Sequence, residues 1–183
     1  MTISIESNEV PAGVWAVDPS HSELGFTVRH AGISKVKGKF TDFEAKVVAN
    51  EDFSETSVTA TAQANSFNSG DEGRDGHVKS ADFFDVENFL VLTFESTNLV
   101  RKGSDFKLEG NLTIKGVTKP VVFDVEFNGV AVDPFGNTRA GLSATTKISR
   151  KEFGLTWNAV LETGGLLVAD SVKIDLELSF IHS

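Results

Sequence analysis

Apolar and polar residues alternate with a period of two over most of the chain, a pattern typical of β-strands with one buried and one solvated face. The alternation is clearest at 106–114, Phe-Lys-Leu-Glu-Gly-Asn-Leu-Thr-Ile, and at 121–128, Val-Val-Phe-Asp-Val-Glu-Phe-Asn. It predicts about eight or nine strands, which form either a closed antiparallel barrel or a two-sheet sandwich. The remaining strands are expected near residues 15–18, 24–30, 36–47, 58–64, 90–94, 140–148 and 172–180.

The segment 36–47 changes phase in its middle. Its apolar positions are even-numbered up to Phe40 and odd-numbered from Phe43 onward. A slip of one residue is the signature of a β-bulge, and bulges help a sheet to curl into a barrel. The slip therefore favours a barrel over flat strands.

Two stretches interrupt the alternation. Residues 73–84 predict a short helix with Arg74, His77 and Ala81 roughly on one face, and we expect this helix to cover one mouth of the barrel. Residues 150–167 predict a turn of helix around Trp157, followed by a loop at Gly164–Gly165.

The interior of an eight-stranded barrel is either filled by side chains or holds one small ligand. The chain has 15 Phe, two Trp and no Tyr, which suits a dry interior. Ala60, Ala62 and Ala64 follow one another on the inward face of one strand. Alanine is a poor strand former, and small residues leave volume in the lumen. The sequence thus leaves two functions open, a binding protein with a cavity and a structural or interaction module with a filled core.

Charge and composition limit the partners. The chain carries 17 Lys and Arg against 26 Asp and Glu, and it has no Lys/Arg cluster, which argues against nucleic acid or an anionic membrane surface as the main partner. Without cysteine it can form no disulfide and no thiolate site. No apolar run approaches the roughly 20 residues of a membrane span. Residues 1–12 are expected to be flexible and lack the features of a signal peptide, so a cytoplasmic location is expected, or a periplasmic or secreted one if a leader was removed.

The residues that could carry chemistry do not form a catalytic pattern. His21, His30 and His77 lack metal-ligand spacing, and no Gly-x-Ser-x-Gly turn is present. His21 is expected to stabilise the turn at Asp18-Pro19-Ser20, while His30 and Thr146 are the inward-facing polar candidates. We therefore expect no enzyme activity, no metal and no cofactor.

Several segments together resemble the YceI-like family. They are Trp-Ala-Val-Asp-Pro-Ser-His-Ser (15–22), Gly-Phe-Thr-Val-Arg-His (25–30), Val-Lys-Gly-Lys-Phe (36–40), Arg-Asp-Gly-His-Val-Lys-Ser-Ala-Asp-Phe-Phe (74–84), Gly-Asn-Leu-Thr-Ile-Lys-Gly-Val-Thr-Lys-Pro-Val (110–121) and Ser-Arg-Lys-Glu-Phe-Gly (149–154). In this order they extend over nearly the whole chain, and the resemblance makes residues 13–183 a single YceI-like domain.

The resemblance implies an all-β, lipocalin-like closed antiparallel barrel of about eight strands with one or two short helices. It also implies an elongated apolar tunnel that binds a polyisoprenoid, quinone-like or fatty-chain amphiphile for sequestration or transport, and it makes a homodimer possible. We expect His30, Arg74 and His77 to meet at one mouth and contact the ligand's polar end. The expected ligand-binding side chains are Phe26, Val28, His30, Phe40, Phe43, Ala60, Ala62, Ala64, Phe67, Arg74, His77, Phe83, Phe84, Leu92, Phe94, Leu112, Phe123, Leu142, Trp157 and Leu176.

Overall fold

The computed structural model describes residues 11–50, 55–159, 161 and 167–183. Within these residues one antiparallel sheet contains nearly all of the regular structure, together with helix α1 (Glu72–Lys79) and three short 3₁₀ turns, η2 (Pro19–His21), η3 (Ala64–Ser66) and η4 (Arg150–Phe153). The strands are β1 (Gly13–Val17), β2 (Glu23–His30), β3 (Ser34–Phe40), β4 (Phe43–Ala49), β5 (Ser57–Gln63), β6 (Phe67–Asn68), β7 (Val91–Lys102), β8 (Asp105–Ile114), β9 (Val117–Val132), β10 (Thr138–Ser149) and β11 (Val168–His182).

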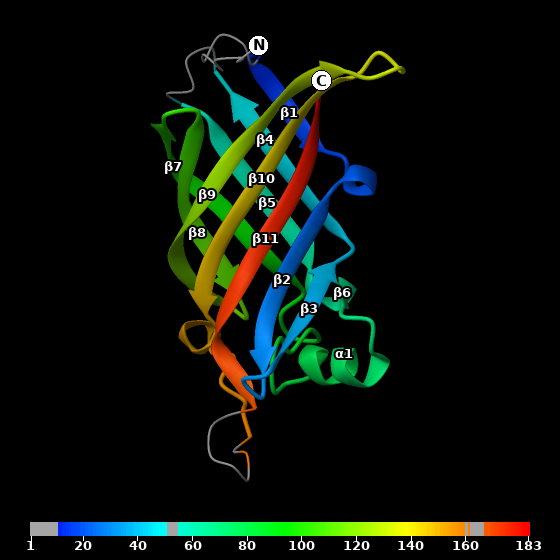
Figure 1. Cartoon of the computed structure of the whole chain (residues 1–183), viewed down its shortest axis with the longest axis vertical. Coiled ribbons are helices and arrows are strands. Elements are labelled where there is room, and N and C mark those ends of the chain that lie inside the picture. Colours follow the sequence, from blue (N-terminus) through cyan, green and yellow to red (C-terminus); the bar gives the residue numbers. More distant parts are fainter. Residues whose placement is uncertain (1–10, 51–54, 160, 162–166) are drawn as a thin grey trace.

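The sheet closes on itself. Its order is β1-β4-β5-β7-β8-β9-β10-β11, and β11 pairs back with β1. This confirms the closed eight-stranded barrel and rules out the two-sheet sandwich. Figure 1 shows an elongated barrel, with α1 and the end of β2 at the end that we call the lower end. The β9–β10 hairpin, β1 and the carboxyl end of β11 lie at the upper end.

Three of the barrel strands are interrupted partway along their length. Residues 18–22 separate β1 from β2, Thr41 and Asp42 separate β3 from β4, and η3 separates β5 from β6. Two of these breaks are joined by hydrogen bonds, since the Thr41 amide donates to the Ser66 carbonyl (3.2 Å) and the Gln63 amide donates to the Asp42 carbonyl (2.8 Å). The sheet therefore bends along a line across neighbouring strands, and β11 pairs with β1 above that line and with β2 below it.

The predicted phase shift has the right position but a different form. Between Phe40 and Phe43 one strand ends and another begins, rather than one ladder carrying a bulge. Register shifts occur elsewhere, between β9 and β10 near Gly141 and between β7 and β8 near Ser96.

Helix α1 confirms the predicted helix but is shorter. The Asp71 carboxylate accepts a hydrogen bond from the Arg74 amide (2.8 Å) and so caps its first turn. The helix ends at Lys79, because Ser80 is extended and its hydroxyl donates to the His77 carbonyl. Ala81 consequently lies beyond the helix and not on its face.

The second predicted helical turn is also displaced. It lies at Arg150–Phe153, and Gly154 ends it with a φ of 78°, a left-handed conformation that glycine adopts without strain. Trp157 follows in irregular backbone. The predicted loop at 164–165 lies outside the described residues.

Candidate functional site

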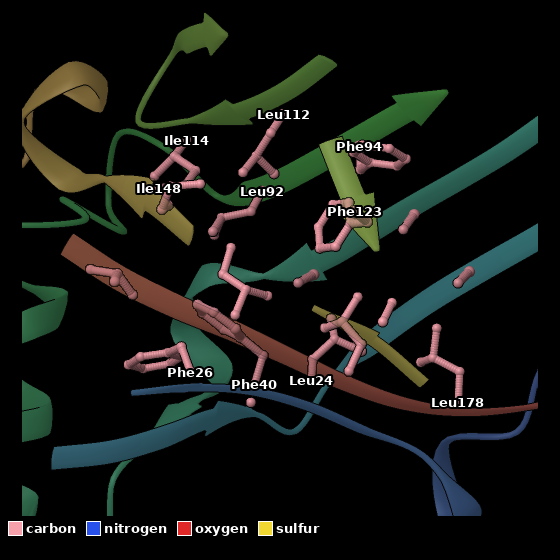
Figure 2. A pocket seen from close by; sticks show the side chains of 18 of the residues that line it. Leu24, Phe26, Phe40, Leu92, Phe94, Leu112, Ile114, Phe123, Ile148 and Leu178 are labelled. Carbon is pink, nitrogen blue, oxygen red and sulfur yellow. The ribbon is translucent and has the colours of Figure 1, made fainter. Parts of the chain in front are cut away.

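The barrel encloses a cavity of about 440 Å³, within the range of small-molecule sites. Nearly all of its lining is apolar and comes from inward positions of the strands on every side of the barrel, with α1 and the residues around Trp157 at the lower end. Figure 2 shows side chains from several strands pointing toward one another across this space. Those labelled are Leu24, Phe26, Phe40, Leu92, Phe94, Leu112, Ile114, Phe123, Ile148 and Leu178.

Glycines next to two phenylalanine rings leave space for these rings against the barrel wall. Phe26 in β2 pairs with Gly38 in β3, and a Cβ added to Gly38 would lie 2.5 Å from the tip of the Phe26 ring. Gly110 in β8 pairs with Ser96, but a Cβ added to it would lie 2.4 Å from the tip of the Phe94 ring in β7. Each ring thus lies against the barrel wall, in the space that a side chain would fill, and projects less into the lumen.

Most of the expected ligand-binding side chains line this cavity; Phe43 and Ala64 do not. Phe43 is buried in a cluster with Phe40, Ala62 and Phe67, behind the cavity surface. Ala64 lies in η3, after β5 has ended at Gln63, so the inward alternation no longer applies to it. For the remaining residues, lining is observed and contact with a ligand stays a prediction.

His30, Arg74 and His77 line the same cavity, and Figure 1 places their elements at the lower end. Two of them are held by other protein groups. The Arg74 guanidinium donates to the hydroxyl (2.8 Å) and carbonyl (3.1 Å) of Ser69, and His77 Nε2 lies 2.9 Å from a carboxylate oxygen of Asp82. Neither side chain is fully available to a ligand in this arrangement.

An aromatic contact joins the two segments that cover the lower end. The ring of His77 meets Trp157 edge-on at 4.5 Å between centroids and Phe83 at 5.2 Å. Trp157 and Phe83 are themselves 5.5 Å apart. The α1 segment and the residues after η4 are therefore in contact with each other at this end of the lumen.

Arg150 also lines the cavity, and its side chain is only 3% exposed. Its guanidinium donates to the backbone carbonyls of Leu155 (2.5 Å), Trp157 (2.9 Å), Ala169 (2.9 Å) and Val168 (3.1 Å). Burial lowers its pKa, because the charged form loses its hydration. A buried positive charge thus fastens residues 155–157 to the start of β11.

The polar groups of the lumen differ from those expected. Thr146 does not line the cavity, since its hydroxyl donates to the Val122 carbonyl (2.8 Å). Arg150 lines it instead, two residues after the inward Ile148, so extending the same alternation past the strand end would have found it. Thr56 lines it as well, with a buried hydroxyl that has no hydrogen-bond partner among the residues that the structure describes.

The turn between β1 and β2 brings a serine, a histidine and an aspartate together without forming a catalytic triad. Nδ1 of His21 lies 3.0 Å from the Ser20 hydroxyl and 2.9 Å from the Asp18 carboxylate. A triad uses the two different ring nitrogens for these partners, so that a proton can pass from serine through the ring. Here both partners meet the same nitrogen, and the contacts stabilise the turn as expected for His21.

Within the described part of the chain, no group of three or more His, Asp or Glu side chains has the spacing to hold a metal ion. None of the helices there has the length and apolarity needed to cross a bilayer.

A closed eight-stranded antiparallel barrel around an apolar cavity is the architecture of the lipocalin-like barrels, which are wide enough for one small ligand. The family model of the YceI-like domain matches residues 15–180. The chain belongs to the YceI-like family, as the sequence motifs indicated.

Similar proteins occur in several bacteria. A UPF0312 protein of Staphylococcus aureus is 41% identical over 165 residues, which cover 89% of this chain and 94% of that protein. The YCEI protein of Campylobacter jejuni is 28% identical over 85% of this chain and 90% of its own, with a TM-score of 0.72. A polyisoprenoid-binding domain from Saccharophagus degradans, implicated in plant cell wall breakdown, shares the fold at 14% identity and a TM-score of 0.71, over 92% of this chain and 98% of its own.

Proposed function

We propose that this protein binds an isoprenoid chain in the barrel lumen and acts without catalysis, in sequestration or transport. The observation that carries the proposal is the apolar cavity of about 440 Å³. A structural module with a filled core would have no such space. The description of the Saccharophagus domain as polyisoprenoid-binding supports the same class of ligand.

The chemistry of the lining fits a long apolar chain with one polar end. Phenylalanine, leucine and valine dominate, and the charged side chains that reach the lining, Arg74 and Arg150, belong to segments of the lower end. At roughly 0.8 kcal/mol per buried CH₂, a twenty-carbon chain has about 16 kcal/mol of gross transfer free energy. Loss of rigid-body and chain entropy offsets part of this, which leaves micromolar to nanomolar affinity.

A pair of neighbouring substitutions on β5 tests the cavity. Ala60 lines the lumen and is only partly buried. Ala62 is packed among Phe40, Phe43 and Phe67, so a larger side chain there would disturb the core as well as fill the lumen, and the two effects could not be separated. Ala60→Phe should place a ring in the lumen and weaken binding of a fluorescent prenyl probe by at least about tenfold, since several CH₂ contacts are displaced. The matched control is Thr59→Phe, at an exposed position of the same strand.

Equal probe affinity in folded Ala60→Phe and Thr59→Phe proteins would contradict binding in the lumen. Mass spectrometry of organic extracts from the native protein identifies the ligand directly. A fatty acid or a quinone in the extract would replace the isoprenoid as the ligand and keep the lumen as its site.

A further inference from the structure

A band of exposed basic side chains crosses the outside of the barrel near its lower end. The strand registers place Lys147 of β10 opposite Lys173 of β11, Lys173 opposite Thr27 of β2, and Thr27 opposite Lys37 of β3. One step closer to the lower end, Arg29 of β2 faces Lys35 of β3. We call Arg29, Lys35, Lys37, Lys147 and Lys173 the basic band; all five are exposed.

The linear sequence hides this band, because residues on one face of a strand are two positions apart and the band draws on four strands. Only the register brings residues near 29, 36, 147 and 173 together. The band also opposes the charge of the whole molecule, which is −9.

Most of the band lacks an internal counterion. Lys173 lies 3.5 Å from Asp175, but Arg29, Lys35, Lys37 and Lys147 form no ion pair with any residue that the structure describes. Like charges directly opposite each other on neighbouring strands, as in the pair of Arg29 and Lys35, destabilise a sheet. Such an arrangement is compensated when an external anion approaches the surface.

Higher on the same face, basic residues do have partners. Lys39 lies 3.9 Å from Glu23, and Lys107 forms an ion pair with Asp124. Lys39 and Lys107 therefore differ from the four residues of the basic band that have no carboxylate partner among the described residues.

An exposed apolar side chain lies beside the band. Ile33 is 89% exposed in the turn between β2 and β3, and His30, at the start of this turn, lines the lumen. An apolar tip flanked by basic residues is the combination that binds the interface of anionic bilayers. A nucleic acid would use the charge but leave Ile33 without a role.

The segment that contains α1 lies next to β3 and β6, and its exposed side chains are mainly acidic, with Arg74 as a basic exception. Asp71, Glu72, Asp82 and Glu87 are exposed on the segment that contains α1. An anionic surface would therefore attract the basic band and repel the neighbouring α1 segment, which favours an approach with the band toward the surface.

We infer that the basic band and Ile33 dock the lower end of the barrel on an anionic lipid surface. An amphiphile then passes between the bilayer and the lumen without exposing its apolar chain to water. This inference rests on the proposed function for its purpose, but docking itself can be measured without a ligand.

The test is flotation of the full-length protein with vesicles of phosphatidylglycerol and phosphatidylcholine. The native protein should float with these vesicles at about 0.1 M salt and not at about 1 M, where the screening length falls to about 3 Å. It should not float with phosphatidylcholine alone. A Lys35→Gln, Lys37→Gln, Lys147→Gln variant should lose about a hundredfold in vesicle partitioning, which is about fivefold for each basic residue.

The upper end supplies matched controls. Lys46→Gln, Arg101→Gln, Lys102→Gln removes the same charge from exposed positions away from the band and should float like the native protein. Ile33→Ser should weaken partitioning by about tenfold. Phe135→Ser should not, although Phe135 is 88% exposed in the β9–β10 hairpin.

Three outcomes would overturn the inference: no flotation of the native protein, equal flotation of the band variant and the control variant, or a band-dependent dimer that does not float. None of Lys35, Lys37 and Lys147 lines the cavity, so both triple variants should bind the prenyl probe normally in the absence of vesicles. Failure to float with normal probe binding rejects docking alone. Failure of the native protein to bind the probe rejects the proposed function instead.

Discussion

At the scale of single residues, Arg150 combines a buried positive charge with four backbone acceptors. Arginine suits this position because its guanidinium presents five donors in a fixed plane and stays charged on burial. The carbonyls it satisfies belong to two segments, residues 155–157 and residues 168–169. One side chain therefore sets how the irregular backbone after η4 lies against the barrel.

Substitution of Arg150 should be costly. Arg150→Met should lower the free energy of unfolding by about 3 kcal/mol, because four backbone carbonyls lose a charged donor. Arg150→Lys should recover only part of this, since an ammonium cannot reach all four acceptors. Urea unfolding of both variants measures the effect. A change below about 0.5 kcal/mol for the methionine variant would mean that water replaces the guanidinium at no cost.

At the scale of elements, the shape of the lumen depends on which side chain faces each phenylalanine. Gly38 allows the Phe26 ring to lie flat against β3. An added methyl group there meets only the far end of a flexible side chain, so the ring can move and the strand can stay in place. The direction in which it can move is toward the lumen.

Gly38→Ala should therefore leave the barrel folded and reduce the space for a ligand. We expect about a tenfold loss in prenyl-probe affinity, comparable to the loss of one or two buried CH₂ contacts. The control is Gly141→Ala, where the new methyl group would lie 3.5 Å from Asn128, an ordinary contact. Equal affinities of the two variants would show that the Phe26 ring does not limit the cavity.

The sequence was most informative for elements whose alternation runs unbroken. Strands β8 to β11 and the inward face of each follow directly from the period of two, because every second side chain must enter one core. Errors occurred where a strand stops and restarts. Ala64 continues the apolar pattern of β5 in the sequence, but the backbone has already turned into η3. Such breaks depend on hydrogen bonds to neighbouring strands, which a single strand's pattern does not contain.

The same limit applied to the site. Apolar lining residues could be predicted from periodicity, whereas the partners of polar side chains could not. Whether Arg74 faces a ligand or Ser69, and whether His77 meets Asp82, depends on how the irregular segments on either side of α1 lie against the helix. The basic band was out of reach for a related reason, since it exists only once the register of four strands is known.

At the scale of the whole molecule, ion pairs of Arg139 connect elements around the seam where β11 meets β1. Its guanidinium lies 2.8 Å from Asp18, after β1, and 2.7 Å from Asp133, in the β9–β10 hairpin. The hydrogen bond from Arg139 is the main reason that the pKa of Asp133 is lowered to about 2. Hydrogen bonds from Ser20 and then Arg139 hold the pKa of Asp18 well below its usual range.

Acid should therefore weaken the seam. An aspartate with a lowered folded-state pKa contributes its full stability above its unfolded-state value of about 3.9 and loses it as the pH falls toward the folded-state value. The urea midpoint of the native protein should fall between about pH 5 and about pH 2. Arg139→Gln should start lower at neutral pH and fall less on acidification.

Lys107→Gln provides the comparison, because it breaks an exposed ion pair with Asp124 and should lower the midpoint only slightly at any pH. If Arg139→Gln and the native protein lose stability in parallel as the pH falls, the seam aspartates are not the source of the acid sensitivity.

The pairing of β1 with β11 also determines when a lumen can exist during synthesis. Trp15, Ala16 and Val17 pair with His182, Ile181 and Phe180, so the barrel stays open until residues near 180 have left the ribosome. At about 5 to 20 residues per second, β1 waits about ten to thirty seconds for this partner. During that time one edge of β1 is free to pair with another nascent chain. The free edge of β1 is therefore an aggregation hazard over that interval, and the barrel can enclose a ligand only after β11 has been synthesised.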